Sequence, residues 1–553
     1  AFYYQPFYYA VFLPLIILFF GKGVVPVIVV QSVISSITVL FIFLSASMLK
    51  GRRSGIFAGL LAAFSSCLCI YVPYLLIETL QAFWVSMIVY LSILCVKRQS
   101  IFLWVLCGIT VSFSILTRGN IWFFVPGLLL LALVSGLRKG RIYSFVLPAI
   151  FIIALLVPQI PFSYWNWQKT GKISGASTAA GAVLGLGNTP EAPPGGRNPG
   201  AGPGPMEYPE IYTDWVSNAR NVTVLAKIKE WAFEEPLAFV ELQLRKILLF
   251  WDSREIPNNI AFEHQGRKSV ILSNICIIPS SILICGFFSS LISYLIFRVC
   301  SKKAFCFDFL YSPFAILLYF AFAYCLGTAA FYNLSRFRNP SLPIFAIFAG
   351  CFIEDFFESF RVGEKERKEK IKVFLIGILF SIFIVFFSYD IYRNNERFIM
   401  RIVRPKGTNI LFSDNTRVVF DNGPVTFGGW QPVEIKNGTT IKKSFVLKEQ
   451  PKLGNSKLKL TIYHLEPGEL FLDVDGVEKK IFAASPGINE HAISIDNHRR
   501  SELEIKFKPD SSKVFPDGKV FFILDRQRDY GRTLINDKTA DGELVCRLYY
   551  GTK

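Results

Sequence analysis

Four charged residues stand in turns between apolar runs, and their chemistry suits an anion. Arg336 and Arg338 lie two residues apart in SRFRNPSLP, Arg118 lies in LTRGN, and Glu78 lies in YLLIETLQAFW. Guanidinium groups pair with phosphate in a forked geometry that lysine cannot match. A carboxylate beside a membrane is costly unless it is hydrated, paired or useful. Three arginines and one acid therefore predict a site for a lipid phosphate beside a polar acceptor.

Simpler interpretations of the same residues stay open at this point. Glu78 could be a helix N-terminal residue favoured by the helix dipole. The arginines could be interfacial anchors that extend to lipid headgroups. His264, in AFEHQGRKS, is a further candidate, although an exposed histidine is most often solvated. The four histidines show no metal-ligand spacing, which excludes a zinc enzyme of the HExxH type, and no P-loop or CxxC pair is present.

Composition shows which kind of protein must position these residues. Of 553 residues, 52% are hydrophobic and only 18% are charged, which predicts membrane spans. The net charge of +18 lies largely in short loops beside apolar runs, as membrane orientation requires, so we predict no nucleic-acid partner.

Ten apolar runs approach the length of about 20 residues that crosses a bilayer. A shorter run from Phe7 to Phe20 predicts an interfacial helix. The ten predicted spans are residues 24–48, 55–73, 78–95, 100–116, 119–136, 143–161, 269–297, 309–332, 341–358 and 371–389.

Charge alternates between the linkers and predicts their sides. Five linkers of one parity hold basic clusters, near Lys50, Lys97, Arg138, Arg298 and Arg361, so that side is predicted to be cytoplasmic. The same count places the linkers with Gln5, Arg118 and SRFR outside. Arg336 and Arg338 thus lie on the side that is poor in Lys and Arg, where a local anionic partner would explain them.

Two polar regions are also predicted to be extracytoplasmic. The insert 162–268 contains a Gly/Pro stretch, LGLGNTPEAPPGGRNPGAGPGPMEYP, predicted to be irregular, and then two helical segments, 224–235 and 236–251, that could lie along the membrane surface. After a linker at 390–404, residues 405–553 alternate with period two, as in KLKLTI, ELFLDV and LEIKF. With Asp475-Gly476 as a hairpin turn, this pattern predicts a β-sandwich.

Four motifs resemble, in order, those of the polytopic GT-C glycosyltransferases, in particular bacterial relatives of the dolichyl-phosphate-mannose protein mannosyltransferases and of the aminoarabinose lipid A transferase. YYQPFYY resembles xPPLYY, with Pro6 kept and Gln5 where some relatives have lysine. IYVPYLLIETLQAFW resembles YSRxxLTE/DT, with Glu78 at the acidic position. GITVSFSILTRGN resembles GLxxGLAxLTRPN, with Arg118 matched. SRFRNPSLPIFAIFAG resembles ARYRLPxxPxLxIxAG. The resemblance covers residues 1–389, and the strands of 405–553 are similar to carbohydrate-binding modules only in their number and alternation.

The resemblance implies transfer of a sugar from a polyprenyl-phosphate carrier to a glycan, lipid or protein acceptor outside the cytoplasm of a bacterium. Arg118, Arg336 and Arg338 would then bind the donor phosphate, while Glu78 orders that site or takes part in catalysis. Gln5 and His264 are further candidates. The family's base is an aspartate in the first outer loop, which we expect to precede Ala1, so the chain reads as a fragment. A divalent metal is left open by the resemblance.

Two other functions remain as alternatives. A transporter or flippase of lipid-linked sugars would show paired half-chains, or spans broken around charges at the membrane midplane. A polymerase or ligase of lipid-linked glycans would share the donor chemistry.

Overall fold

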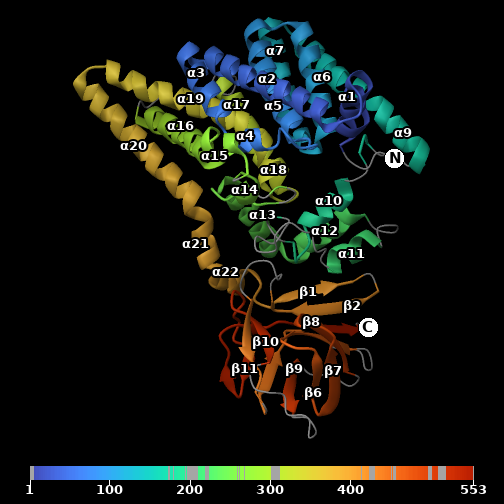
Figure 1. Ribbon diagram of the computed structural model, residues 1–553. Coiled ribbons are helices and arrows are strands. Elements are labelled where there is room, and N and C mark those ends of the chain that lie inside the picture. The colour runs from blue at the N-terminus through green and yellow to red at the C-terminus, as the bar shows by residue number, and fades with distance from the viewer. Residues whose placement is uncertain are drawn as a thin grey trace. The chain divides into compact units, whose positions relative to one another are not determined.

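The computed structural model divides the chain into two compact units, 1–183 with 245–390 and 184–244 with 391–553. Helices make up the first unit, and two sheets with a few helices make up the second (Figure 1). The model describes residues 5–171, 175–177, 180–192, 195, 210–217, 223–257, 260, 262–266, 268–300, 312–412, 414–422, 430–436, 438–449, 451, 456–495, 501–508 and 519–551.

Long apolar helices dominate the first unit. Within the described residues, 6 helices are long and apolar enough to cross a membrane, or 7 if the bent pair Glu364–Phe386 and Ser388–Asn394 is one span. The six are Val24–Lys50 (α2), Glu78–Arg98 (α5), Gly119–Lys139 (η2 and α7), Tyr143–Thr170 (α8 to α9), Ser280–Val299 (within α16) and Ser335–Arg361 (α18 to η6). Shorter apolar helices span Tyr8–Phe20 (η1 and α1), Ile101–Thr117 (α6) and Pro313–Ala329 (α17). The prediction of a polytopic helical membrane protein is thus confirmed.

Two predicted continuous spans are interrupted, which corrects the prediction. The run 55–73 forms α3 (Arg52–Ala63) and α4 (Ser66–Ile70), and the run 269–297 forms α15 (Val270–Asn274) and α16 (Ser280–Cys300). The two breaks pair with each other. Ile278 N donates to the carbonyl of Phe64 at 3.1 Å, and Ser66 N donates to the carbonyl of Ile278 at 3.0 Å. These bonds satisfy backbone groups that the broken helices leave free, as a membrane protein requires.

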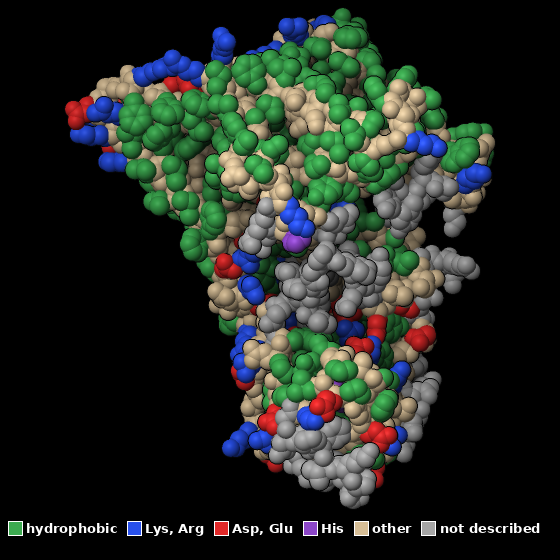
Figure 2. Space-filling view, viewed as in Figure 1, with side chains coloured by type: hydrophobic (Ala, Val, Ile, Leu, Met, Phe, Trp, Pro, Cys, Tyr) green, Lys and Arg blue, Asp and Glu red, His purple; other side chains and the backbone are tan. Residues whose placement is uncertain are grey.

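The basic linkers meet at one end of this unit. The Lys50 ammonium pairs with Asp355, Lys97 Nζ donates to the carbonyl of Met48 at 2.6 Å, and Lys139 Nζ donates to the carbonyl of Gln99 at 3.0 Å. Figure 2 shows a largely hydrophobic surface on this unit, with Lys and Arg gathered along its upper edge. Four of the five linkers that charge parity grouped on one side, all but the one near Arg298, are therefore neighbours in space.

The second unit contains two antiparallel sheets that enclose one core, which confirms the predicted sandwich. One sheet has the order β1-β2-β14-β5-β10-β13, with β3 beside β10 and β8 beside β5, and the other has the order β12-β11-β4-β9-β6-β7. The strands are β1 Thr408–Leu411, β2 Thr416–Phe420, β3 Trp430–Glu434, β4 Thr440–Ser444, β5 Ser456–His464, β6 Gly468–Val474, β7 Val477–Ala483, β8 Gly487–Ile495, β9 Glu502–Lys508, β10 Val520–Asp525, β11 Thr533–Ile535, β12 Lys538–Thr539, β13 Glu543–Leu544 and β14 Cys546–Gly551.

The period-two pattern identified the buried face correctly. Each inward residue of KLKLTI, ELFLDV and LEIKF lies in the sandwich core. Asp475 and Gly476 join β6 to β7 with φ of 51° and 84°, the left-handed pair that a two-residue hairpin turn needs.

The insert 162–268 contributes helices to both units, and its residues 184–244 belong to the second. Leu184–Gly187, predicted to be irregular, belongs to α10 (Ala180–Gly187), and most of the Gly/Pro stretch lies outside the described residues. α11 spans Glu210–Ser217, α12 spans Val224–Glu234, and α13 (Pro236–Trp251) runs from this unit into the first. Trp215 and Trp231 pack in one apolar cluster with Val418 and Phe420 of β2. Helix α12 thus packs against the sheet that contains β2. Helices α21 (Ser388–Asn394) and α22 (Glu396–Val403) occupy the predicted linker 390–404.

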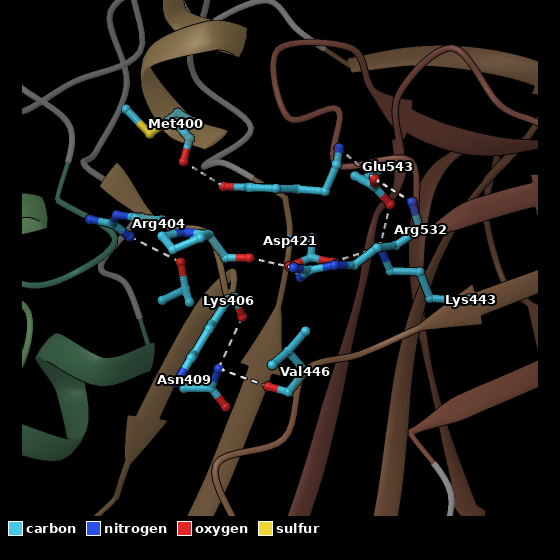
Figure 3. Close-up of polar contacts among 12 residues, drawn as sticks. Met400, Arg404, Lys406, Asn409, Asp421, Lys443, Val446, Arg532 and Glu543 are labelled. Carbon is cyan, nitrogen blue, oxygen red and sulfur yellow. Dashed lines mark hydrogen bonds and ion pairs between the residues drawn. The ribbon is translucent and has the colours of Figure 1, made fainter. Parts of the chain in front are cut away.

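A buried ion network ties the two sheets together. Lys443 Nζ contacts Asp421 Oδ2 at 2.9 Å and Glu543 Oε2 at 2.5 Å, and Arg532 also binds Asp421, at 3.1 Å (Figure 3). The side chains of Lys443, Asp421 and Glu543 are at most 1% exposed. Burial lowers the pKa of Lys443, but the two carboxylates more than offset burial, so its pKa lies above the usual value.

We expect Lys443→Met to lower the free energy of unfolding of this unit by about 3 kcal/mol, because it leaves two buried carboxylates without their cation. Denaturant unfolding of the full-length protein measures the change. Lys442→Ala is the matched control, since its side chain on the same strand is exposed and its replacement should change the free energy of unfolding little. Equal effects of the two variants would contradict the prediction.

Two histidines also meet inside the sandwich. His464 Nε2 lies 3.3 Å from His491 Nε2, between β5 and β8. Burial and the neighbouring His491 lower the pKa of His464 to about 4, and burial lowers that of His491. The unfolded chain therefore binds more protons than the folded one between pH 6.5 and 4.

We expect the unit to lose about 2 kcal/mol of stability as the pH falls from 7.5 to 4.5. Thermal unfolding at several pH values should show this loss in wild type and a smaller loss in His464→Gln. His264→Gln, which changes an exposed histidine, should behave as wild type. An identical pH dependence in His464→Gln would refute the assignment.

Candidate active site

Glu78 begins α5 after a turn that two other helices hold in place. Gln31 of α2 donates from Nε2 to the carbonyls of Val72, at 2.7 Å, and Tyr74, at 2.9 Å. Its Oε1 accepts from the Tyr8 hydroxyl at 3.0 Å. The helix Tyr8–Phe20 and α2 therefore fix the backbone that leads into Glu78.

The Glu78 carboxylate is fully buried and gathers two of the predicted arginines. Its Oε1 accepts from Arg118 Nη2 at 3.1 Å and lies 3.8 Å from Arg336 Nε. Its Oε2 has no hydrogen-bond partner among the described residues. One oxygen thus orders two cations, while the other is buried and available to a further donor.

Arg118 ends α6 in an extended conformation and turns toward the SRFR segment. Its Nη1 donates to the carbonyl of Arg336 at 3.5 Å. The guanidinium groups of Arg118 and Arg336 lie 4.3 Å and 4.9 Å from the centre of the Phe337 ring. Cation–π contact with this ring stabilises both positive charges close together. Their side chains are 11% and 18% exposed, so both remain partly open.

Arg338 has a different environment from its neighbour Arg336. Its side chain is 5% exposed, and its Nη2 pairs with Glu255 at 2.8 Å and donates to Ser280 Oγ at 3.1 Å. Its remaining bonds go to carbonyl oxygens at the end of α13 and just after it, those of Phe250, Asp252 and Arg254. Within the SRFR segment, Arg336 therefore pairs with Glu78, while Arg338 contacts residues 250–255.

Gln5 and His264 are not brought to this cluster by any hydrogen bond or ion pair of the described residues. Gln5 has a φ of 54°, and its carbonyl accepts from Tyr9 N at 3.3 Å. His264 is exposed on α14 (Phe262–Gly266). Ion pairs thus join Glu78, Arg118 and Arg336, whereas Arg338 pairs with Glu255.

Several residues near Glu78, Arg118 and Arg336 were not predicted from the sequence. Tyr71, 3% exposed, is in electrostatic range of Glu78, Arg336 and Glu255, and Tyr324, which is fully buried, is in range of Arg118. Glu255 belongs to WDSREIP, a charged run directly after an apolar helix, and that contrast could have drawn attention to it.

The arrangement suits an anion better than a metal. Among the described residues, no group of three His, Cys, Asp or Glu side chains could hold a metal ion. Two guanidinium groups against one carboxylate leave a net positive charge in a water-poor environment. Preorganised cations in such surroundings stabilise negative charge that develops on a bound oxygen.

Known structures resemble the chain only distantly. The archaeal oligosaccharyltransferase AglB from Archaeoglobus fulgidus, in complex with an inhibitory peptide and a dolichol-phosphate, is 12% identical, with 68% of this chain and 48% of that chain covered at a TM-score of 0.37. ArnT from Cupriavidus metallidurans, bound to undecaprenyl phosphate, is 13% identical, with 72% and 63% covered at a TM-score of 0.33. The chain thus spans about half the length of AglB. No curated protein matches the sequence.

A family model supports the motifs directly. Residues 4–165 match the model described as dolichyl-phosphate-mannose-protein mannosyltransferase, and this segment includes Gln5, Glu78 and Arg118. Over residues 4–165, the resemblance that the motifs predicted is therefore confirmed.

Proposed function

We propose that this protein is a membrane glycosyltransferase that moves a sugar from a polyprenyl-phosphate carrier to an acceptor outside the cytoplasm. The observation that carries the proposal is the convergence of Arg118 and Arg336 on Glu78, three residues from three separate motifs of one resemblance. The family match over residues 4–165 supports the same reaction class.

The two arginines would bind the phosphate of the donor. Breaking the bond between sugar and phosphate leaves a lipid phosphate with growing negative charge, and two fixed guanidinium groups stabilise that charge more in the transition state than in the bound donor. Glu78 acts through the arginines, because its Oε1 holds both in place while the phosphate approaches their outer edges. Arg338 does not bind the phosphate in this proposal and instead stabilises the fold through Glu255 and the carbonyls of Phe250 and Arg254.

The reaction would occur at the end of the helical unit opposite to the basic linkers. Under the positive-inside rule, the end with Lys50, Lys97 and Lys139 faces the cytoplasm. The insert helices and the sandwich form one compact unit, which fits the prediction that both segments lie on the same, extracytoplasmic side. We therefore propose a bacterial plasma-membrane protein that acts on a glycan, lipid or protein at the outer face.

An assay in membranes that contain the full-length protein tests the proposal. Radiolabelled polyprenyl-phosphate sugars are supplied, and label is followed from the lipid fraction into acceptors. Transfer to acceptors in wild-type membranes, above that in membranes without the protein, supports the enzyme. Label that crosses the bilayer while it stays on its lipid would instead identify a flippase. Growth of a lipid-linked glycan chain would identify a polymerase.

A further inference from the structure

Two pairs of cysteine thiols are in contact within the helical unit. Cys69 of α4 meets Cys276, which lies between α15 and α16, and Cys95 of α5 meets Cys107 of α6. All four are free thiols in the structure. Sequence spacing predicted neither pair, since Cys69 and Cys276 are separated by most of the helical unit.

The backbone around Cys69 and Cys276 holds the first pair together. Ser65 and Ile278 form a parallel bridge, and Ser66 Oγ also donates to the Ile278 carbonyl, at 3.2 Å. Cys69 follows this bridge by one helical turn and Cys276 precedes it by two residues. The contact between the thiols is therefore built into the junction of two interrupted helices.

The two pairs lie toward opposite ends of the unit. Cys69 and Cys276 are near the ends of predicted spans that charge parity places outside. Cys95 lies just before Lys97 and Arg98, at the basic end. Disulfides persist in oxidising extracytoplasmic compartments and are rare in the cytosol. One pair thus faces oxidising conditions and the other does not.

Solvent accessibility also favours oxidation of Cys69 and Cys276, which are called the outer pair because they are predicted to lie outside. Cys69 is partly exposed, while Cys276 is 5% exposed, and Cys95 and Cys107 are both fully buried. Thiol–disulfide exchange needs one accessible sulfur to attack the oxidant and a second sulfur to resolve the intermediate. Cys69 fits the first role and Cys276 the second.

We propose that Cys69 and Cys276 form a disulfide in the mature protein, whereas Cys95 and Cys107 stay reduced. The oxidant is an extracytoplasmic disulfide, of a thiol oxidoreductase or a small molecule. The Cys69 thiolate attacks it and releases one oxidant thiol. The Cys276 thiolate then attacks the Cys69 sulfur of the mixed disulfide, so the oxidant leaves as two thiols that carry the two electrons and two protons.

The disulfide would stabilise the two segments that carry partners of Arg338 and Glu255. Cys67, two residues before Cys69, donates to Glu255 at 3.4 Å, and Ser280, four residues after Cys276, contacts Glu255 and Arg338. Both joined segments therefore carry partners of the Arg338 network. The inference depends on the predicted sides of the membrane and not on the reaction catalysed.

Differential thiol labelling of the full-length protein in its native membrane tests this proposal. Thiols are blocked by acid quenching and N-ethylmaleimide, the protein is denatured, and a heavy maleimide is added before or after reduction. We expect heavy label on Cys69 and Cys276 only after reduction, together with a crosslinked peptide that is two hydrogens lighter than its parts. Maleimide on both residues without reduction would overturn the proposal.

Single variants provide the controls. In Cys69→Ser, Cys276 should become available to label without reduction, while Cys107→Ser should leave the outer pair protected. Oxidation of Cys95 and Cys107 in place of the outer pair would overturn both the proposal and the assignment of sides. Because the wild-type measurement needs no variant, a folding defect in Cys69→Ser would not prevent the test.

Discussion

Replacing Arg336 with alanine is expected to lower the rate of sugar transfer per folded molecule by about 10²- to 10³-fold, as the loss of one preorganised donor at a developing anion does in other enzymes. Arg118→Ala should have an effect of the same order, because both guanidinium groups meet at Glu78. The in-membrane assay, normalised to folded protein, measures both rates.

Matched variants separate this effect from a general loss of charge. Arg336→Lys keeps the cation but loses the fork, so its rate should lie between those of wild type and Arg336→Ala. Arg98→Ala removes an exposed arginine at the basic end and should leave transfer unchanged. Full activity in both Arg118→Ala and Arg336→Ala would remove the phosphate site from consideration.

Replacing Arg338 with methionine is expected to reduce stability by about 3–5 kcal/mol, because the change leaves the partly buried Glu255 and several carbonyl oxygens without their donor. Less folded protein should be recovered in detergent, with a lower unfolding temperature. The molecules that do fold should retain most of their transfer rate.

A double variant checks the physical reason. Arg338→Met combined with Glu255→Leu removes the uncompensated charge as well as its partner, so part of the lost stability should return. If Arg338→Met were instead as stable as wild type but inactive, Arg338 would belong at the donor phosphate, as the sequence first predicted.

The elements with strong periodicity were predictable because their signal is local. The strands of KLKLTI, ELFLDV and LEIKF, the Asp475-Gly476 turn and helices α12 and α13 all follow from alternation or spacing within short windows. The interrupted runs 55–73 and 269–297 were mispredicted, because hydropathy does not distinguish a continuous apolar helix from a broken one whose free backbone groups find distant partners.

The sequence by itself determined that this chain is a polytopic membrane protein, which linkers share an end, and that Glu78 and Arg118 lie close together. Composition, charge parity and motif order provide that information, because each can be read directly from the amino-acid sequence. Only the tertiary structure decided that Arg336 and Arg338 diverge, that Glu255 holds the second of them, and that Cys69 meets Cys276. Those outcomes depend on which side chains from distant segments reach one another, and local spacing does not encode that.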